Sequence, residues 1–291
     1  MKKRKLGIIG GSGLYKMEGF EKTKWKKIKT SWGNPSDEVL TAKLGKEDIC
    51  FIPRHARGHK INPSKINFRA NIDAMKQMDV TDIVSVSAVG SLKENLKPGT
   101  FVVVDQFIDR TVARAKTFFD DEIVAHVSMA KPVSQSLGEC CQTALKKMNI
   151  SHQMNGTYIA MEGPQFSTLA ESNLYRSWGA DVIGMTNMPE AKLAREAEIR
   201  YCTVAMVTDY DCWHPDHDEV DVAMVIQTLT KNALKAQNMI KEVIKTYKDF
   251  SAEKDPANDC LDTAIITDSK LRTKQTIKKL QYIAGRILNK K

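Results

Sequence analysis

Two carboxylates one residue apart, Asp209 and Asp211, follow an apolar run over residues 201–208. Such a run predicts a buried strand, and acids at its end are delivered to the carboxyl edge of a sheet. There they can accept hydrogen bonds from an exocyclic amine and give a proton to a ring nitrogen. Both abilities suit a 6-aminopurine. Two turn acids at a solvated strand end are the alternative that these residues alone leave open.

Hydroxyl or basic side chains end four other predicted strands. An arginine fork matches phosphate in geometry and charge, while a histidine, hydroxyls and the backbone N–H groups of a Gly-rich turn add donors. One such loop carries little weight, but four of them predict an oxyanion cage on one rim of the sheet. Its members are Ser12, Arg54, His55, Ser87 and Thr186.

The cage and the two acids together indicate a reaction. A phosphate held at one end and a purine held at the other would flank the anomeric carbon of a ribose. The predicted chemistry is therefore phosphorolysis of an N-glycosidic bond. A purine hydrolase is one alternative, but there water would replace phosphate and the cage would have no purpose.

The elements that must position these groups alternate between strand-like and helix-like runs, which predicts an α/β fold. We expect a single domain over residues 1–291, with a central mixed twisted β-sheet flanked by helices and a C-terminal helical extension from about residue 250. Strands are predicted over 5–9, 49–52, 82–86, 100–104, 156–161, 181–186 and 201–208, and helices over 64–78, 135–148, 168–178, 189–198, 220–248 and 268–288.

Composition narrows the function classes. The 291 residues contain no apolar stretch near the ~20 residues that a bilayer needs, and no signal-peptide core, so we expect a cytoplasmic protein without a membrane partner. The net charge of +9 is spread over the surface without a nucleic-acid motif. A non-catalytic nucleotide or nucleic-acid binding protein is nevertheless the rival from another class, and we expect no nucleic-acid partner.

No metal site is predicted. The six cysteines lack zinc-ligand spacing and are expected to be buried thiols. The segment Trp213–Glu219 holds His, Asp and Glu residues, but its proline and tight spacing favour a gating loop. Phosphorolysis of an N-glycosidic bond needs no metal.

Motifs spread over residues 5–245 resemble the trimeric purine nucleoside phosphorylase family, and most closely its branch that acts on S-methyl-5′-thioadenosine. The resemblance implies a homotrimer with sites near subunit contacts, and no cofactor, since inorganic phosphate is a co-substrate. The motifs are Gly7–Leu14, Arg54–His55, Asn71–Lys76, Ser87–Leu92, Asp105–Thr111, Glu162–Ser167, Ala170–Ser172, Trp178–Asp181, Met185–Ala191 and the Asp209 segment.

At the phosphate end, the resemblance assigns the same side chains as the strand-end pattern and adds the backbone at Ala88. Serine at positions 12 and 87 departs from the threonine that is common in this branch, although it keeps a hydroxyl donor. The implied phosphate-binding residues are Ser12, Arg54, His55, Ser87, Ala88 and Thr186.

At the base end, Asp209 is implied as the general acid toward N7 of adenine and Asp211 as its partner on the N6 amine, and the two roles can be exchanged. Ser167 stands where enzymes for 6-oxopurines have a glutamate, and Asp209 stands where they have an asparagine. Both positions therefore indicate adenine, because mispairing one buried polar group costs ~1–3 kcal/mol.

Around the sugar, the resemblance implies further substrate contacts from Met185, Phe166 and Tyr210. His126 is implied near the 5′ substituent, reaching in from a neighbouring subunit. An apolar slot for a methylthio group is expected from Val222 and its neighbour Val225, since a thioether needs no polar partner. Asn289 falls where the family closes this slot with an apolar residue, which would favour tolerance of adenosine.

The function that these features imply is phosphorolysis of S-methyl-5′-thioadenosine to adenine and 5-methylthioribose 1-phosphate, a step of purine and methionine salvage. A broader purine nucleoside phosphorylase that also accepts adenosine or 6-oxopurine nucleosides is the alternative.

Overall fold

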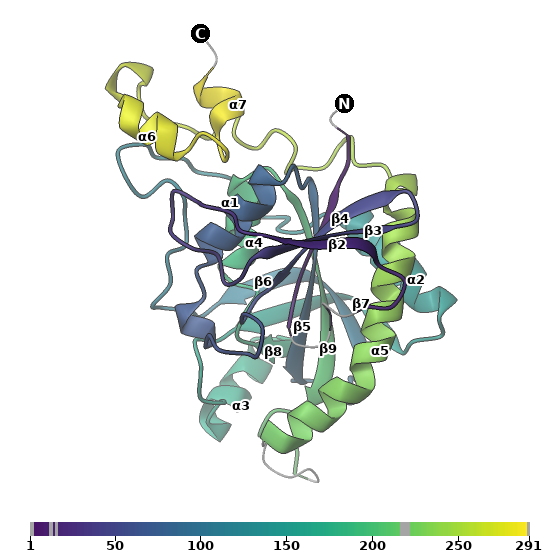
Figure 1. The fold of residues 1–291 in the computed structure, drawn as a ribbon. Coiled ribbons are helices and arrows are strands. Elements are labelled where there is room, and N and C mark those ends of the chain that lie inside the picture. The colour runs from purple at the N-terminus through teal and green to yellow at the C-terminus, as the bar shows by residue number, and fades with distance from the viewer. Residues whose placement is uncertain (1–2, 12–13, 15–16, 216–221, 290–291) are drawn as a thin grey trace.

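The computed structural model describes residues 3–11, 14, 17–215 and 222–289, and of residues 222–224 it describes the backbone (Figure 1). Nine strands form one mixed sheet in the order β2-β3-β4-β1-β5-β8-β7-β6-β9. They are β1 (Leu6–Gly10), β2 (Glu21–Lys26), β3 (Val39–Leu44), β4 (Glu47–Pro53), β5 (Asp82–Ser91), β6 (Phe101–Asp109), β7 (His152–Ala160), β8 (Val182–Gly184) and β9 (Arg200–Asp209).

The sheet closes on itself at one end. Strand β9 pairs antiparallel with β6 and also parallel with β5, so that β5, β8, β7, β6 and β9 form a ring. Strands β4, β1, β5 and β9 are parallel neighbours. Their carboxyl ends therefore share one rim, and their amino ends share the opposite rim.

Helices cover both faces of the sheet. Helices α1 (Phe68–Gln77) and α4 (Glu190–Glu196) pack on one face, and α2 (Gln135–Lys147) and α5 (Val222–Thr246) pack on the other (Figure 1). Because both faces are covered, β1 and β9 are buried along their whole length. The remaining helices are α3 (Leu169–Ser177), α6 (Lys274–Lys279), α7 (Gly285–Leu288) and three 3-10 turns, Pro63–Lys65, Tyr247–Asp249 and Ser269–Leu271.

The structure confirms the predicted α/β class, with its mixed sheet and flanking helices. It also contains a hairpin of β2 and β3 that the sequence did not predict, because β2 is largely exposed and lacks apolar alternation. The prediction of one final helix over residues 268–288 was wrong, because this stretch forms a 3-10 turn and the two short helices α6 and α7. Thr273 caps the new helix α6, and the chain then turns so that Leu280, Ile283 and Ala284 are all buried.

Within the part of the chain that the structure describes, no helix is long and apolar enough to cross a membrane. All six cysteines are free thiols, and four of them are buried. The segment after residue 250 lies beside α1 and α4 at the end of the molecule that holds the chain termini (Figure 1). It is tied there by Arg286, whose guanidinium contacts Glu198 and Asp262.

Candidate active site

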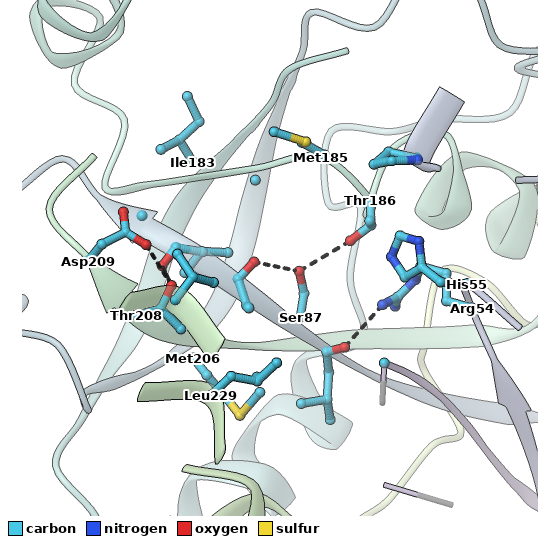
Figure 2. Close-up of a pocket in the computed structure, with 18 of the residues that line it drawn as sticks. Arg54, His55, Ser87, Ile183, Met185, Thr186, Met206, Thr208, Asp209 and Leu229 are labelled. Carbon is cyan, nitrogen blue, oxygen red and sulfur yellow. Dashed lines mark hydrogen bonds between the residues drawn. The ribbon is translucent and has the colours of Figure 1, made fainter. Parts of the chain in front are cut away.

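A cavity of about 250 Å³ opens at the rim where the parallel strands end. Figure 2 shows Asp209 and Thr208 at one side of it, Arg54, His55 and Thr186 at the other, and Ser87 between them. One cavity thus joins the two groups of residues that the sequence singled out. Its lining includes Gly11, Leu14, Arg54, His55, Ser87, Ala88, Gly90, Met161, Phe166, Ile183, Met185, Thr186, Met206, Thr208, Asp209, Asp211, Val225, Leu229 and Ala233.

A β-bulge places Asp209 in this cavity. In the β5–β9 pair, Val89 faces Val207 but Gly90 faces Asp209, so the register shifts by one residue at the rim. Bulges re-aim side chains in this way. The register needs glycine at position 90, because a Cβ there would lie 2.8 Å from Asp209 Oδ1 and 3.3 Å from Asp211 Cβ.

Asp209 is buried, and among the described residues it forms no ion pair. Burial raises the pKa of its carboxyl and the nearby Asp211 charge adds to this, while bonds from Thr208 and the Asp211 amide act in the other direction. The Asp211 amide donates to Asp209 Oδ1 at 2.8 Å. The carboxyl is therefore poised to hold a proton at a higher pH than an ordinary aspartate.

Thr208 can keep its contact with Asp209 whether or not the carboxyl carries a proton. Its Oγ1 lies 2.6 Å from Asp209 Oδ2 and 3.1 Å from the Val89 carbonyl oxygen. The hydroxyl has one hydrogen, which it can donate to an ionised Asp209. A proton on Asp209 lets Thr208 donate to Val89 and still keep the short contact to the carboxyl.

Asp211 is also buried, and its backbone has a φ of 53°. Left-handed backbone is uncommon for aspartate, and residues held there gather at functional sites. Burial raises the pKa of Asp211, against the hydroxyls of Ser172 and Ser167 and the Cys212 amide, which lower it. These two neighbouring carboxyls form no ion pair with the residues that the structure describes, and together they can hold a proton and accept hydrogen bonds from an amine.

At the opposite end, Ser87 and Thr186 bring their hydroxyls together. Their oxygens lie 3.2 Å apart, and Ser87 Oγ lies 3.4 Å from the hydroxyl of Tyr158. Tyr158 is fully buried beneath them, and a Cβ on Gly184 would collide with its hydroxyl at 2.0 Å. Ser87 and Thr186, predicted from two strand ends 99 residues apart, are thereby in hydrogen-bond contact.

Arg54 lines the cavity, but most of its guanidinium is engaged by protein. Nε and Nη2 donate to the Glu190 carboxylate at 2.9 and 3.0 Å, and Nη1 donates to the Val86 carbonyl at 3.1 Å. Burial alone would lower the pKa of Arg54, but Glu190 outweighs it and holds the guanidinium charged. Among the described residues, the second Nη1 hydrogen has no acceptor, which leaves one donor for an anion.

His55 is neutral in this environment. Burial lowers the pKa of the imidazole to about 4, although its bond to Ile61 acts in the other direction. Nδ1 lies 2.8 Å from the Ile61 carbonyl, which can only accept, so Nδ1 carries the hydrogen of the neutral ring. Nε2 is then an acceptor, and its natural partner on a phosphate is a P–OH group.

The sugar side of the cavity is apolar. Met185 and Phe166, which were both predicted to contact the substrate, line the cavity, and Phe166 is partly exposed. Val225, Leu229 and Ala233 of α5 add an aliphatic wall. Ser167 lies beside the lining rather than in it, with Oγ 3.6 Å from Met161 Sδ.

Besides Ser167, the described residues Tyr210 and His126 were predicted as site residues and do not line the cavity. The Tyr210 hydroxyl donates to the Glu94 carbonyl at 3.2 Å, and its ring packs on Trp213. His126 is exposed, and its backbone N–H donates to Ala264. Ser12, the side chain of Val222 and part of the Trp213–Glu219 segment lie outside the described residues. Asn289 is exposed and does not line the cavity.

Sequence reasoning missed four residues that shape the site. Glu190 lay within a quoted motif but received no role, and Tyr158, Ser85 and Gly90 were not singled out. The available signal was the position of Glu190 at the start of a predicted helix, directly after the Thr186 strand end. Its partner Arg54 lies 136 residues away, and no local pattern joins the two.

The comparisons with known proteins agree with this geometry. The family model of the phosphorylase superfamily matches residues 5–245. The chain belongs to the phosphorylase superfamily. A relative in this superfamily from Rhodospirillum rubrum, named S-methyl-5′-thioadenosine phosphorylase, is 56% identical over 97% of this chain and 97% of its own. One from Cereibacter sphaeroides with the same name is 51% identical over 98% and 99%.

Solved phosphorylase structures resemble the chain as well. A methylthioadenosine phosphorylase from an Antarctic soil metagenomic library superposes with a TM-score of 0.91 at 44% identity, covering 97% of this chain and 99% of its own. The Schistosoma mansoni methylthioadenosine phosphorylase, solved with adenine, gives 0.82 at 34% identity, covering 86% and 93%.

Proposed function

We propose that the protein is an S-methyl-5′-thioadenosine phosphorylase that releases adenine and forms 5-methylthioribose 1-phosphate. The observation that carries the proposal is one cavity with two buried carboxyls at one end, which form no ion pair with any described residue, and a hydroxyl-rich cage around Arg54 at the other. The names of its full-length relatives support the same activity.

The geometry supports an acid-assisted mechanism. The bond between C1′ and N9 breaks, and its electron pair goes to adenine. Asp209, or Asp211 if the roles are exchanged, gives a proton to N7, which makes the base a better leaving group. A phosphate oxygen held by Arg54, Ser87 and Thr186 then bonds to the cationic C1′. The charge of the phosphate stabilises that cation in the transition state.

The apolar wall favours a thioether over a hydroxyl at the 5′ position. Val225, Leu229 and Ala233 offer no hydrogen-bond partner, and an unpartnered hydroxyl buried among them would lose free energy. This lining supports the methylthio substrate over the broader alternative that accepts adenosine or 6-oxopurine nucleosides.

The test is adenine release from S-methyl-5′-thioadenosine with and without inorganic phosphate, beside adenosine and inosine. We expect turnover of the thioether substrate that depends on phosphate, with inosine ignored. Release without phosphate would contradict the role of the cage, and equal use of adenosine would contradict the role of the apolar wall.

The assembly, compartment and co-reactants belong to the same proposal. We propose a homotrimer, supported by large apolar side chains left exposed beside the site, including Val112, Leu169 and Trp178. Light scattering should give three times the 32.6 kDa of the chain.

Free cysteines support a reducing, cytoplasmic compartment. Phosphate is a co-substrate, and the mechanism needs no cofactor and no metal.

A further inference from the structure

Glu190 is a fully buried carboxylate directly behind the anion end of the cavity. It begins α4, and both of its oxygens accept from Arg54, at 2.9 Å from Nε and 3.0 Å from Nη2. The Arg54 side chain exposes 2% of its surface and the Glu190 side chain exposes none. Arg54 is the only member of the predicted cage that is always positively charged. In the free protein it is therefore already paired with Glu190.

The Glu190 carboxylate accepts hydrogen bonds from two hydroxyls as well as from Arg54. Ser85 and Tyr201 each donate their hydroxyl hydrogen to Oε1 at 2.8 Å. Their own oxygens accept from Asn187 Nδ2, at 2.9 and 2.7 Å, so those hydrogens are free to point at Glu190. With Arg54 the carboxylate receives four donors, and a proton on it would displace one of them.

The other cage side chains that the structure describes carry no net charge. His55 is a neutral imidazole for the reasons given above, and Ser87 and Thr186 are hydroxyls. Another cation, Arg114, donates to the carbonyl oxygens of Met185 and Met188, on either side of Thr186 in the chain, and it is paired with Glu162 at 3.1 Å. Glu162 is ionised, since hydrogen bonds and Arg114 overcome its burial and hold its pKa at about 2.

We propose that Glu190 balances the charge of Arg54, so that the cage binds phosphate through hydrogen bonds while leaving its negative charge uncompensated for the cationic sugar. This inference rests on the proposed function, because it assigns the phosphate a part in the transition state. Catalysis requires interactions that are stronger in the transition state than in the ground state. A cage with a net positive charge would bind phosphate more tightly and would also oppose the developing sugar cation.

The test is Glu190→Gln, which keeps the shape of the side chain and removes its charge. We expect the Kd for inorganic phosphate, measured by calorimetry, to fall on the order of ten-fold, because an unbalanced Arg54 then faces the anion. We expect kcat at saturating phosphate to fall on the order of ten-fold as well. Tighter binding with slower turnover is a split that a purely structural defect does not produce.

Tyr201→Phe is the matched control. It removes one hydrogen bond to the same Glu190 oxygen and leaves every charge in place. Its phosphate Kd should stay within about two-fold of the wild-type value, although its Tm should fall. If Glu190→Gln and Tyr201→Phe both weaken phosphate binding and lower kcat in parallel, Glu190 only holds the geometry of Arg54 and the proposal is overturned.

A second pair of variants keeps the test decisive if Glu190→Gln does not fold. His55→Lys adds a positive charge to the cage from another side, and His55→Gln is its neutral counterpart. Relative to His55→Gln, the lysine variant should bind phosphate more tightly and turn over more slowly. Tighter binding with equal or faster turnover would overturn the proposal.

Failure of the proposed function gives a different result. In that case the wild-type protein would release no adenine in the presence of phosphate. Calorimetry with inorganic phosphate would still report whether removing the Glu190 charge tightens anion binding, so the electrostatic part of the inference can be judged without turnover.

Discussion

Two buried aspartates occupy opposite ends of neighbouring strands and have opposite surroundings. Asp82 begins β5, where Arg200 donates to it twice at 2.7 Å and Arg4 Nη2 donates at 2.9 Å. Asp209 ends β9 on the other rim and, among the described residues, has no cationic partner. Burial alone would raise the pKa of both carboxyls, but at Asp82 the two arginines reverse the shift and lower it.

The comparison separates what burial does from what pairing does. A buried carboxylate with two arginines is held charged and fastens the amino-terminal rim, where Arg200 also reaches Asn258 of the C-terminal segment. At Asp209 burial and the charge of a second acid outweigh a hydroxyl and a backbone amide, so the pKa of that carboxyl is raised. The same strands therefore carry a structural acid at one end and a chemical acid at the other.

Replacement of the chemical acid should give the largest effect. Asp209→Asn cannot donate a proton to adenine N7, so kcat with S-methyl-5′-thioadenosine should fall by about 10²–10⁴-fold. Steady-state kinetics at saturating phosphate would measure the loss. Asp211→Asn is the matched control, and a larger loss there would exchange the two roles. Unchanged turnover in both variants would refute the assignment of a proton donor at this rim.

Replacement of the structural acid should act on stability instead. Asp82→Asn leaves the buried Arg200 and its neighbour Arg4 without their carboxylate, and breaking a buried pair costs about 3–5 kcal/mol of the free energy of unfolding. Urea denaturation would measure it. The kcat of the folded fraction should stay near the wild-type value, because Asp82 lies on the opposite rim. A stable variant with lost activity would contradict the division between the two rims.

The chemical rim was easier to predict from the sequence than the network behind it. Arg54, Ser87, Thr186 and Asp209 each follow a buried apolar run, and parallel strands bring such positions to one edge. Local order along the chain is enough for that inference. The pairing of Arg54, which follows β4, with Glu190 of α4 is a tertiary contact between residues 136 positions apart, and the sequence holds no local sign of it.

Long-range closure is the other feature that the sequence did not reveal. The β5–β9 pairing turns the sheet into a partial ring and creates the bulge at Gly90 that aims Asp209. A glycine in a strand can indicate a bulge, but it does not identify the facing strand. The exposed strand β2 lacks the apolar alternation by which a half-buried strand is recognised.

The pH dependence of stability should differ in sign between the two acids. The folded pKa of Asp82 lies below its unfolded value, so its contribution is present above the unfolded pKa and is lost as pH falls through the folded one. The folded pKa of Asp209 is raised, so its contribution is present at low pH and is lost as pH rises. The difference in free energy of unfolding between wild type and Asp82→Asn should therefore shrink as the pH falls. The free energy of unfolding of Asp209→Asn should rise relative to that of wild type as the pH approaches neutral.

Urea titrations between pH 3 and pH 8 would test both signs on one set of proteins. A deficit of Asp82→Asn that grows in acid would contradict the role of the two arginines. An Asp209→Asn variant whose relative stability falls as the pH rises would show that the wild-type carboxylate has a cationic partner.

The smallest expected effect concerns the hydroxyl of Ser167 beside Asp211. This hydroxyl lowers the pKa of the carboxyl, so Ser167→Ala should raise that pKa further. A hydrogen bond worth ~0.5–1.5 kcal/mol corresponds to a shift of no more than about one pH unit in the limb of the kcat profile that Asp211 controls. Ser177→Ala, on the exposed end of α3, is the control that should leave the profile in place. If the Ser167→Ala profile shifts toward lower pH, the hydroxyl stabilises the protonated form of Asp211. The surroundings of Asp211 and Asp209 would then differ from those of Asp82 by more than the missing arginines.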